Sequence, residues 1–294
     1  MKTKLVPFLA ALLTFTFVGC TQQESEETVK EKIAEDIEET IEESIEIEPG
    51  TIPLDYPTVE TSAEIGQYVL VPSREFLEDA FKEGAENSNF IFYAATMIEP
   101  GEVESLVEDL IGDQFTMPNS LIIPIKPTET AAVGDVVLTW WQSGSGMEQA
   151  IVTVEGPTPT VRYLDDFQEA EDVLLANSFH PLTGKIEPGN AVAVKQDNDS
   201  YELAEVINVA DDKVLLSGFA GILEVANISD LTAIPSTIEV AVGDTVLAPI
   251  IDEFDEVTVT EVNAEIGQIT GEYEWASEMT KEIFVFGEII KSLP

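Results

Sequence analysis

The sequence predicts a mainly β protein made of tandem small barrels that follow an acidic N-terminal segment. Two observations lead to this prediction. A glycine turn that feeds a short apolar strand occurs four times, at Gly66, Gly134, Gly189 and Gly243, and the last three glycines lie 55 and 54 residues apart. Strands rich in β-branched residues, with alternating polarity, follow each of these later turns. Such regular self-similarity is typical of a repeat architecture.

Each of the last three copies contains further strands after its opening one. The second strands are expected at 149–154, 202–207 and 256–262, and the third strands at 160–164, 213–216 and 267–271. Each copy therefore holds four or five short strands in about 55 residues. This length suits a small curled sheet that protects its edges by near closure.

The first copy departs from this pattern. Residues 74–85, between its opening strand and the strand at 90–95, are expected to form a short helix with Phe76 and Leu77 on its apolar side. A second helical piece is expected at 103–110. The first unit is therefore predicted to be a β domain decorated with short helices.

The last three copies resemble the Tudor-like and agenet-like SH3-type barrels. The resemblance rests on a Gly turn, a Val/Leu strand, a polar loop and two further strands, and it covers residues 131–294. It implies binding of a peptide or a modified side chain in a cage of aromatic residues beside the first hairpin. For such a cage the third copy supplies only Phe219.

The first nineteen residues have the features of a secretory signal. Lys2 and Lys4 precede an apolar run over 5–18, which is shorter than the roughly 20 residues that span a bilayer. The run ends at Gly19 and Cys20, and the tetrapeptide Phe17-Val18-Gly19-Cys20 resembles the lipobox of bacterial lipoproteins.

This resemblance implies a lipid on Cys20, which is also the only cysteine of the chain. Two or more acyl chains, such as palmitate, hold a protein on a membrane essentially permanently. Thr21 follows the cysteine where lipoproteins retained in the inner membrane often carry Asp, so the resemblance favours the outer membrane. We therefore expect a lipid-anchored protein of the bacterial cell envelope.

Residues 24–48 contain twelve carboxylates and only two lysines. Val or Ile recurs at every fourth position from Val29 to Ile45, which indicates a helix with one narrow apolar stripe. Glu pairs four residues apart repel each other, so an isolated helix is marginal at neutral pH. We expect a flexible, self-repelling spacer. A helix for a partner or for self-association is the alternative.

These patterns divide the chain into six segments. They are a signal peptide (1–19), a lipidated acidic tether (20–52), a decorated β domain (53–128) and three barrel repeats (129–185, 186–236 and 237–294).

Aromatic residues mark the candidate ligand-binding sites. Trp140 and Trp141 are adjacent on a strand, so one should lie in the core and the other at the surface. Tyr163, on the third strand of that copy, is expected near the outward one. An aromatic cleft for a peptide or a glycan is the functional interpretation, and packing between neighbouring barrels is the alternative. Tyr273 and Trp275 make the same suggestion in the last copy.

Composition excludes several function classes. The chain has 57 acidic and 13 basic residues and a net charge of −44, which argues against nucleic acid as a partner. One Cys and one His exclude internal disulfides and Cys/His zinc sites. Carboxylates cluster at 165–172 and 252–256 without EF-hand spacing, so solvated loops are expected and weak calcium binding is the alternative. No metal and no cofactor are predicted.

We therefore expect a non-enzymatic binding or scaffolding module that is anchored to the membrane through Cys20, with an envelope protein or peptide as partner. The alternative is a carbohydrate- or peptide-active hydrolase with paired carboxylates beside Trp140 and Trp141. Ser143, Ser145 and His180 lack the sequence context of a catalytic triad. A third interpretation takes the charge as a solubility adaptation to salt.

Overall fold

The computed structural model describes residues 47–164 and 170–294. The signal peptide, Cys20, most of the acidic tether, and Asp165, Asp166 and Glu169 of the first acidic cluster lie outside these ranges. Within the described ranges, no helix is both long and apolar enough to cross a membrane.

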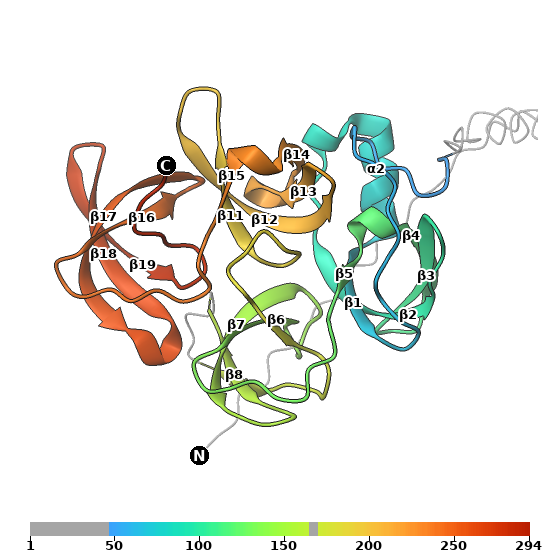
Figure 1. The fold of residues 1–294 in the computed structure, drawn as a ribbon, viewed down its shortest axis with the longest axis horizontal. Helices are drawn as coiled ribbons and strands as arrows, with labels where there is room; N and C mark the ends of the chain where they lie inside the picture. The colour runs from blue at the N-terminus through green and yellow to red at the C-terminus, as the bar shows by residue number, and fades with distance from the viewer. Residues whose placement is uncertain (1–46, 165–169) are drawn as a thin grey trace, which may run out of the picture. The chain divides into compact units, whose positions relative to one another are not determined.

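Antiparallel β-sheets dominate the described residues, which confirms the prediction of a mainly β protein (Figure 1). The first sheet has the order β4-β3-β2-β1-β5. Its strands are β1 (Tyr68–Pro72), β2 (Phe92–Glu99), β3 (Glu104–Asp109), β4 (Gln114–Pro118) and β5 (Ile123–Pro124). The second sheet has the equivalent order β10-β6-β7-β8-β9. Its strands are β6 (Val136–Trp140), β7 (Met147–Val154), β8 (Thr160–Tyr163), β9 (Glu171–Val173) and β10 (His180–Pro181).

A larger sheet contains two further sets of strands, joined by the pairing of β12 with β17 at Glu202 and Glu253. The third set comprises β11 (Ala191–Lys195), β12 (Tyr201–Ala210), β13 (Lys213–Ser217), β14 (Leu223–Asn227) and β15 (Leu231–Ala233). The fourth comprises β16 (Thr245–Ile250), β17 (Glu253–Asn263), β18 (Gln268–Trp275) and β19 (Glu278–Val285).

All four sets share one connectivity. In the first three sets the fifth strand returns to pair with the first strand, at the side opposite the second. In the fourth set an isolated bridge between Leu247 and Ile290 takes the place of this last pairing. Each set is therefore a four-strand meander with a returning fifth segment.

The four glycine turns found in the sequence occupy equivalent positions. Their N–H groups donate to the carbonyl oxygens of Met97, Val152, Val206 and Val259, respectively, at 2.7 to 2.9 Å. Their φ angles lie between 81° and 94°, a region that favours glycine. Just after each of these acceptor residues, the register of the second strand shifts. The first copy thus shares the hairpin geometry of the other three.

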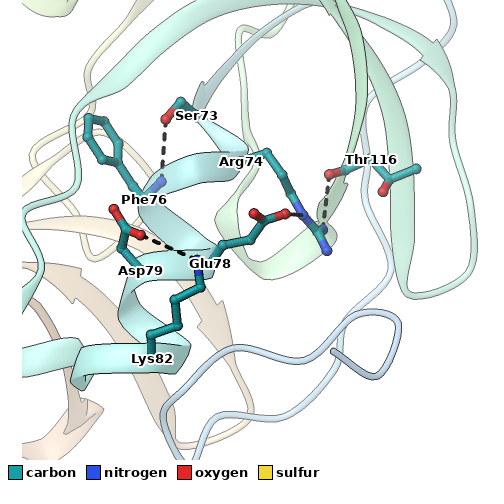
Figure 2. A network of polar contacts seen from close by, with 7 residues as sticks. All are labelled: Ser73, Arg74, Phe76, Glu78, Asp79, Lys82 and Thr116. Carbon is teal, nitrogen blue, oxygen red and sulfur yellow. Dashed lines mark hydrogen bonds and ion pairs between the residues drawn. The ribbon is translucent and has the colours of Figure 1, made fainter. Parts of the chain in front are cut away.

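The helix predicted at 74–85 is confirmed as α2 (Arg74–Glu83). Its first turn is capped by Ser73, whose Oγ accepts a hydrogen bond from Phe76 N at 3.4 Å. Figure 2 shows how Arg74 fixes the helix, because its guanidinium pairs with Glu78 at 3.3 Å and donates to the carbonyl oxygen of Thr116 on β4 at 3.3 Å.

The prediction of a helix at 103–110 is wrong, because this segment forms strand β3. Ser105 and Val107 are buried while their neighbours are less so, which is the alternation of a strand rather than of a helix. Pairing with β2 and β4 on both sides outweighs the local helix propensity. Besides α2, the described residues contain five short 3₁₀ turns, which are η1 (Ala85–Asn87), η2 (Asn119–Leu121), η3 (Phe219–Gly221), η4 (Ile228–Asp230) and η5 (Ala264–Ile266).

Three smaller hydrophobic clusters lie within the second and third strand sets, whereas the largest cluster is shared by all four. Its buried side chains come from all four sets, and they include Leu70, Trp140, Leu215 and Val257. Backbone hydrogen bonds also join the sets, as from Ala94 N to the carbonyl oxygen of Ser145 at 2.8 Å. The sets are therefore packed against one another rather than linked as independent beads.

Candidate functional site

Trp140 is the core member of the tryptophan pair. It is 1% exposed, and its ring lies 4.9 Å from the ring of Tyr68 in the first sheet. Tyr163 is also buried, and its hydroxyl donates to the carbonyl oxygen of Trp140 at 3.2 Å and accepts from Gln142 N at 3.0 Å. Burial raises the pKa of Tyr163 above its ordinary range. Neither ring offers a face to a ligand, and Trp140 serves packing between strand sets.

Trp141 is the surface member of the pair, with 52% of its surface exposed. The core and surface alternation predicted for the two tryptophans is therefore confirmed. Its backbone closes the tight turn between β6 and β7, since Gly144 N donates to the carbonyl oxygen of Trp141 at 2.9 Å. A side chain at Gly144 would meet the indole at 3.3 Å, so the ring lies over its own turn.

Tyr273 and Trp275 lie on β18 but differ in environment. Tyr273 is buried, and its hydroxyl donates to Oε2 of Glu282 at 2.6 Å. This bond to a carboxylate, together with burial, raises the pKa of Tyr273 to about 12. Trp275 is 51% exposed at the end of the β18–β19 hairpin. Of the five predicted aromatic residues, Trp141 and Trp275 alone are accessible.

Carboxylates converge elsewhere, in a cavity of about 220 Å³ that we call the acidic pocket. Its carboxylates are Glu205 on β12, Asp252 in the β16–β17 turn, and Glu288 after β19. Leu203 N donates to the carbonyl oxygen of Asp252 at 2.9 Å, which fixes this turn against β12. Residues from the second, third and fourth strand sets thus line one concave site.

Glu205 has strongly perturbed electrostatics in this pocket. Burial raises its pKa to about 7, the negative charge of Glu288 adds to the shift, and a hydrogen bond from Gln149 Nε2 to Oε1 at 3.4 Å opposes it. A carboxyl group of this kind is partly protonated at neutral pH. It gains most from a positive charge placed beside it.

Apolar side chains flank the acidic pocket. Phe219 in η3 is 56% exposed, and Ile251 in the β16–β17 turn is 66% exposed. Ile251 also has a φ of 68°, which is a costly conformation for a β-branched residue. Exposed apolar groups beside carboxylates suit a ligand that carries a cation on a hydrocarbon stem.

Among the carboxylates of the acidic pocket, Asp252 belongs to the 252–256 cluster expected from the sequence, whereas Glu205 and Glu288 were not predicted. The repeats contain a signal for Glu205, because in the hairpin register it is equivalent to Ile151: each is the residue before the acceptor of the glycine N–H. Ile151 is fully buried in the second copy. The first and fourth copies have Thr96 and Thr258 at this position, so the signal is the contrast with the second copy alone.

The described parts of the chain contain no group of three or more His, Cys, Asp or Glu side chains that could hold a metal ion. No protein-family model and no curated protein sequence match the chain.

Proposed function

We propose that this protein is a non-enzymatic binding or scaffolding module of the bacterial cell envelope. In this proposal a lipid on Cys20 holds it on a membrane, and Thr21, the residue after the cysteine, favours the outer membrane. The sequence Phe17-Val18-Gly19-Cys20 after an apolar signal supports the anchor. The folded part consists, in this proposal, of four SH3-type or Tudor-like barrels. Their support is the shared strand connectivity, in which a returning fifth segment curls each meander toward closure.

The acidic pocket carries the binding part of the proposal. It combines a partly buried glutamate of raised pKa, two further carboxylates and exposed apolar neighbours. The chain beyond Gly50 has 45 acidic and nine basic residues, so its field attracts cations over long range. We infer that the partner is a basic segment of an envelope protein or peptide, with a Lys or Arg side chain in the pocket.

The binding proposal is tested with a fluorescently labelled oligolysine peptide and the full chain. Binding is measured by anisotropy at pH 8, where Glu205 is ionised, and at near-physiological salt, where the Debye length is about 8 Å. Glu205→Gln should weaken binding about tenfold, because a charge-assisted contact is lost. Glu261→Gln, which neutralises an exposed carboxylate of β17 outside the pocket, is the matched control. Equal effects of the two variants would show that only the overall charge acts.

The anchor is tested separately. Cys20→Ser should release the mature chain into the soluble fraction and abolish acyl labelling. A variant that stays membrane-bound with an unchanged mass contradicts the lipid anchor.

One observation favours the hydrolase as a second candidate function. Glu205, with a pKa of about 7, shares a concave site with Glu288, and a general acid paired with a second carboxylate is the arrangement of glycoside hydrolysis. Trp140 and Tyr163 provide no platform for a sugar, because they are buried. Release of reducing ends or free amines from envelope polymers, lost in both Glu205→Gln and Glu288→Gln, would establish this activity.

A further inference from the structure

A second cavity, of about 420 Å³, is lined by residues of the first three strand sets and of the segment before β1. We call it the His180 cavity, after the only histidine of the chain. Its volume lies in the range of small-molecule sites, roughly 300 to 1,000 Å³. It shares no lining residue with the acidic pocket.

The walls of the His180 cavity are built from buried, hydrogen-bonded polar groups. Of the ten buried polar side chains in the described ranges, Asn119, His180 and Asn190 line this cavity. Asn119 accepts from Ser105 Oγ at 2.6 Å and donates to the carbonyl oxygens of Val59 and Gly101, both at 3.0 Å. A cavity with walls fixed in this way loses little entropy when it binds a ligand.

Asn190 fixes another part of the cavity wall. Its Oδ1 accepts from the backbone N–H groups of Thr183 at 3.1 Å and Gly184 at 2.8 Å, and its Nδ2 donates to the carbonyl oxygen of Glu187 at 3.2 Å. These bonds hold the Thr183–Glu187 loop, from which the Glu187 side chain reaches the cavity.

His180 is 9% exposed, and its Nδ1 has no hydrogen-bond partner in 47–164 or 170–294. Burial lowers its pKa to about 4, the charge of Lys126 lowers it further, and the charge of Glu187 opposes the shift. The ring is therefore neutral at pH 7 and has one donor and one acceptor nitrogen. A buried polar group of this kind is costly unless it is used, at about 1–3 kcal/mol.

A positive and a negative side chain thus act on one imidazole. Lys126 makes no ion pair with the residues that the structure describes. Glu187 accepts a hydrogen bond from Thr183 Oγ1 at 3.1 Å, which orients its carboxylate. Both residues line the His180 cavity. The cavity therefore offers a cation, an anion and neutral hydrogen-bonding groups within one small volume.

We propose that the His180 cavity binds a small zwitterion, either a free amino acid or a short peptide with both ends unblocked, with its carboxylate at Lys126 and its ammonium at Glu187. The opposite charges of the two side chains match those of the ligand, and the neutral His180 ring hydrogen-bonds between them. This site is independent of the proposed binding of a basic segment, because the two cavities have no residue in common.

The single histidine makes a direct test simple. In the tag-free full chain, the carbon-bound protons of His180 give the only imidazole signals in a proton NMR spectrum. Titration at fixed pH with L-alanine and with L-alanyl-L-alanine should shift these signals to a plateau, and the tighter ligand distinguishes a free amino acid from a short unblocked peptide. Acetate, methylamine and the doubly blocked dipeptide N-acetyl-L-alanyl-L-alanine amide should produce no saturable shift.

The charged contact is tested with a matched pair of variants. Lys126→Met should weaken binding of the better ligand about tenfold, because a charge-assisted hydrogen bond is lost. Lys291→Met removes an exposed lysine near the C-terminus that does not line the cavity and should leave the affinity within about twofold of wild type. The same Lys126→Met change should raise the pKa of His180 while leaving it below the unfolded value of about 6.5, because the larger effect of burial remains only if the variant is folded. The proposal is overturned if no zwitterion shifts the signals, if the blocked dipeptide binds equally well, or if both variants bind like wild type.

Discussion

The ring of Trp140, at the end of β6, packs on the ring of Tyr68, at the start of β1, with centroids 4.9 Å apart and planes inclined by 56°. This contact joins the first sheet to the second. A residue that the sequence marked as half of a ligand cleft is thus part of the shared core.

Replacement of Trp140 should therefore destabilise the protein. Trp140→Ala is expected to lower the free energy of unfolding by about 3–5 kcal/mol, as for other buried aromatic residues. Trp141→Ala, the same change one residue further at an exposed position, should cost less than about 0.5 kcal/mol. Urea unfolding followed by circular dichroism measures both. Similar losses in the two variants would contradict the assignment of Trp140 to the core.

The fold was predictable where local chemistry determines it. Each repeat glycine needs a positive φ, so Gly66, Gly134, Gly189 and Gly243 stand out in the sequence and in the structure alike. The 103–110 segment was not predictable in the same way. Its Glu and Leu residues suit a helix, whereas the pairing of β3 with β2 and β4 makes it a strand.

His180 should make stability depend on pH. Its pKa is about 4 in the folded state and about 6.5 when unfolded, so between these values the unfolded chain binds more protons. Folding is therefore weakened as pH falls through this window, by up to about 3 kcal/mol from this residue. The difference in unfolding free energy between wild type and His180→Gln, measured in urea from pH 7.5 to 4, isolates this effect from that of the carboxylates. A difference that does not change with pH would mean that His180 is not buried as a neutral ring.

Glu205 should have the opposite dependence. Its folded pKa of about 7 exceeds the ordinary value, so the stability it contributes is fully present below about pH 4.5 and is lost as pH rises through 7. At pH 8, Glu205→Gln should therefore be more stable than wild type, by about 1–2 kcal/mol after allowance for partial exposure. Thermal unfolding at pH 5 and pH 8 measures the change.

Glu261→Gln serves as control for Glu205→Gln, because it removes the same charge at an exposed position of β17. It should change stability little and equally at both pH values. If Glu205→Gln behaves in the same way, Glu205 is solvated and the acidic pocket does not perturb it.

The candidate sites were predictable only in part. The −44 charge argued against nucleic acid as a partner, and Asp252 lay in a cluster visible in the sequence. Glu205 and Glu288 are separated by 83 positions and meet only because two strand sets pair between β12 and β17. In the His180 cavity, Asn119 comes from η2, His180 from β10 and Asn190 from the residue before β11, and each alone has the pattern of an ordinary core polar residue.

The acidic segment at 24–48 can be tested as a peptide. Its Glu pairs repel at neutral pH, and protonation removes this penalty while the stripe from Val29 to Ile45 is unchanged. Helix content, measured by circular dichroism in low salt, should be low at pH 7 and rise as pH falls through the Glu range near about 4. High helicity at pH 7 that decreases on acidification would contradict the spacer prediction.

The last prediction concerns a chain that begins at Ala131 and lacks the first strand set. The other three sets keep their strand pairings, so its circular dichroism should be mainly β. It loses the packing of the Tyr68 ring on Trp140 and the hydrogen bond between Ala94 and Ser145. It also exposes core surface, which costs about 25 cal/mol of free energy per Å² of apolar area. The truncated chain should therefore unfold at lower urea concentration than the full chain, and its tryptophan emission should be red-shifted as Trp140 meets water.

Introducing Trp140→Ala into both chains is the control, because it should reduce the difference in emission between them. A mainly helical spectrum would contradict the repeat assignment, whereas an unchanged unfolding midpoint would show that the first strand set contributes nothing to the shared core.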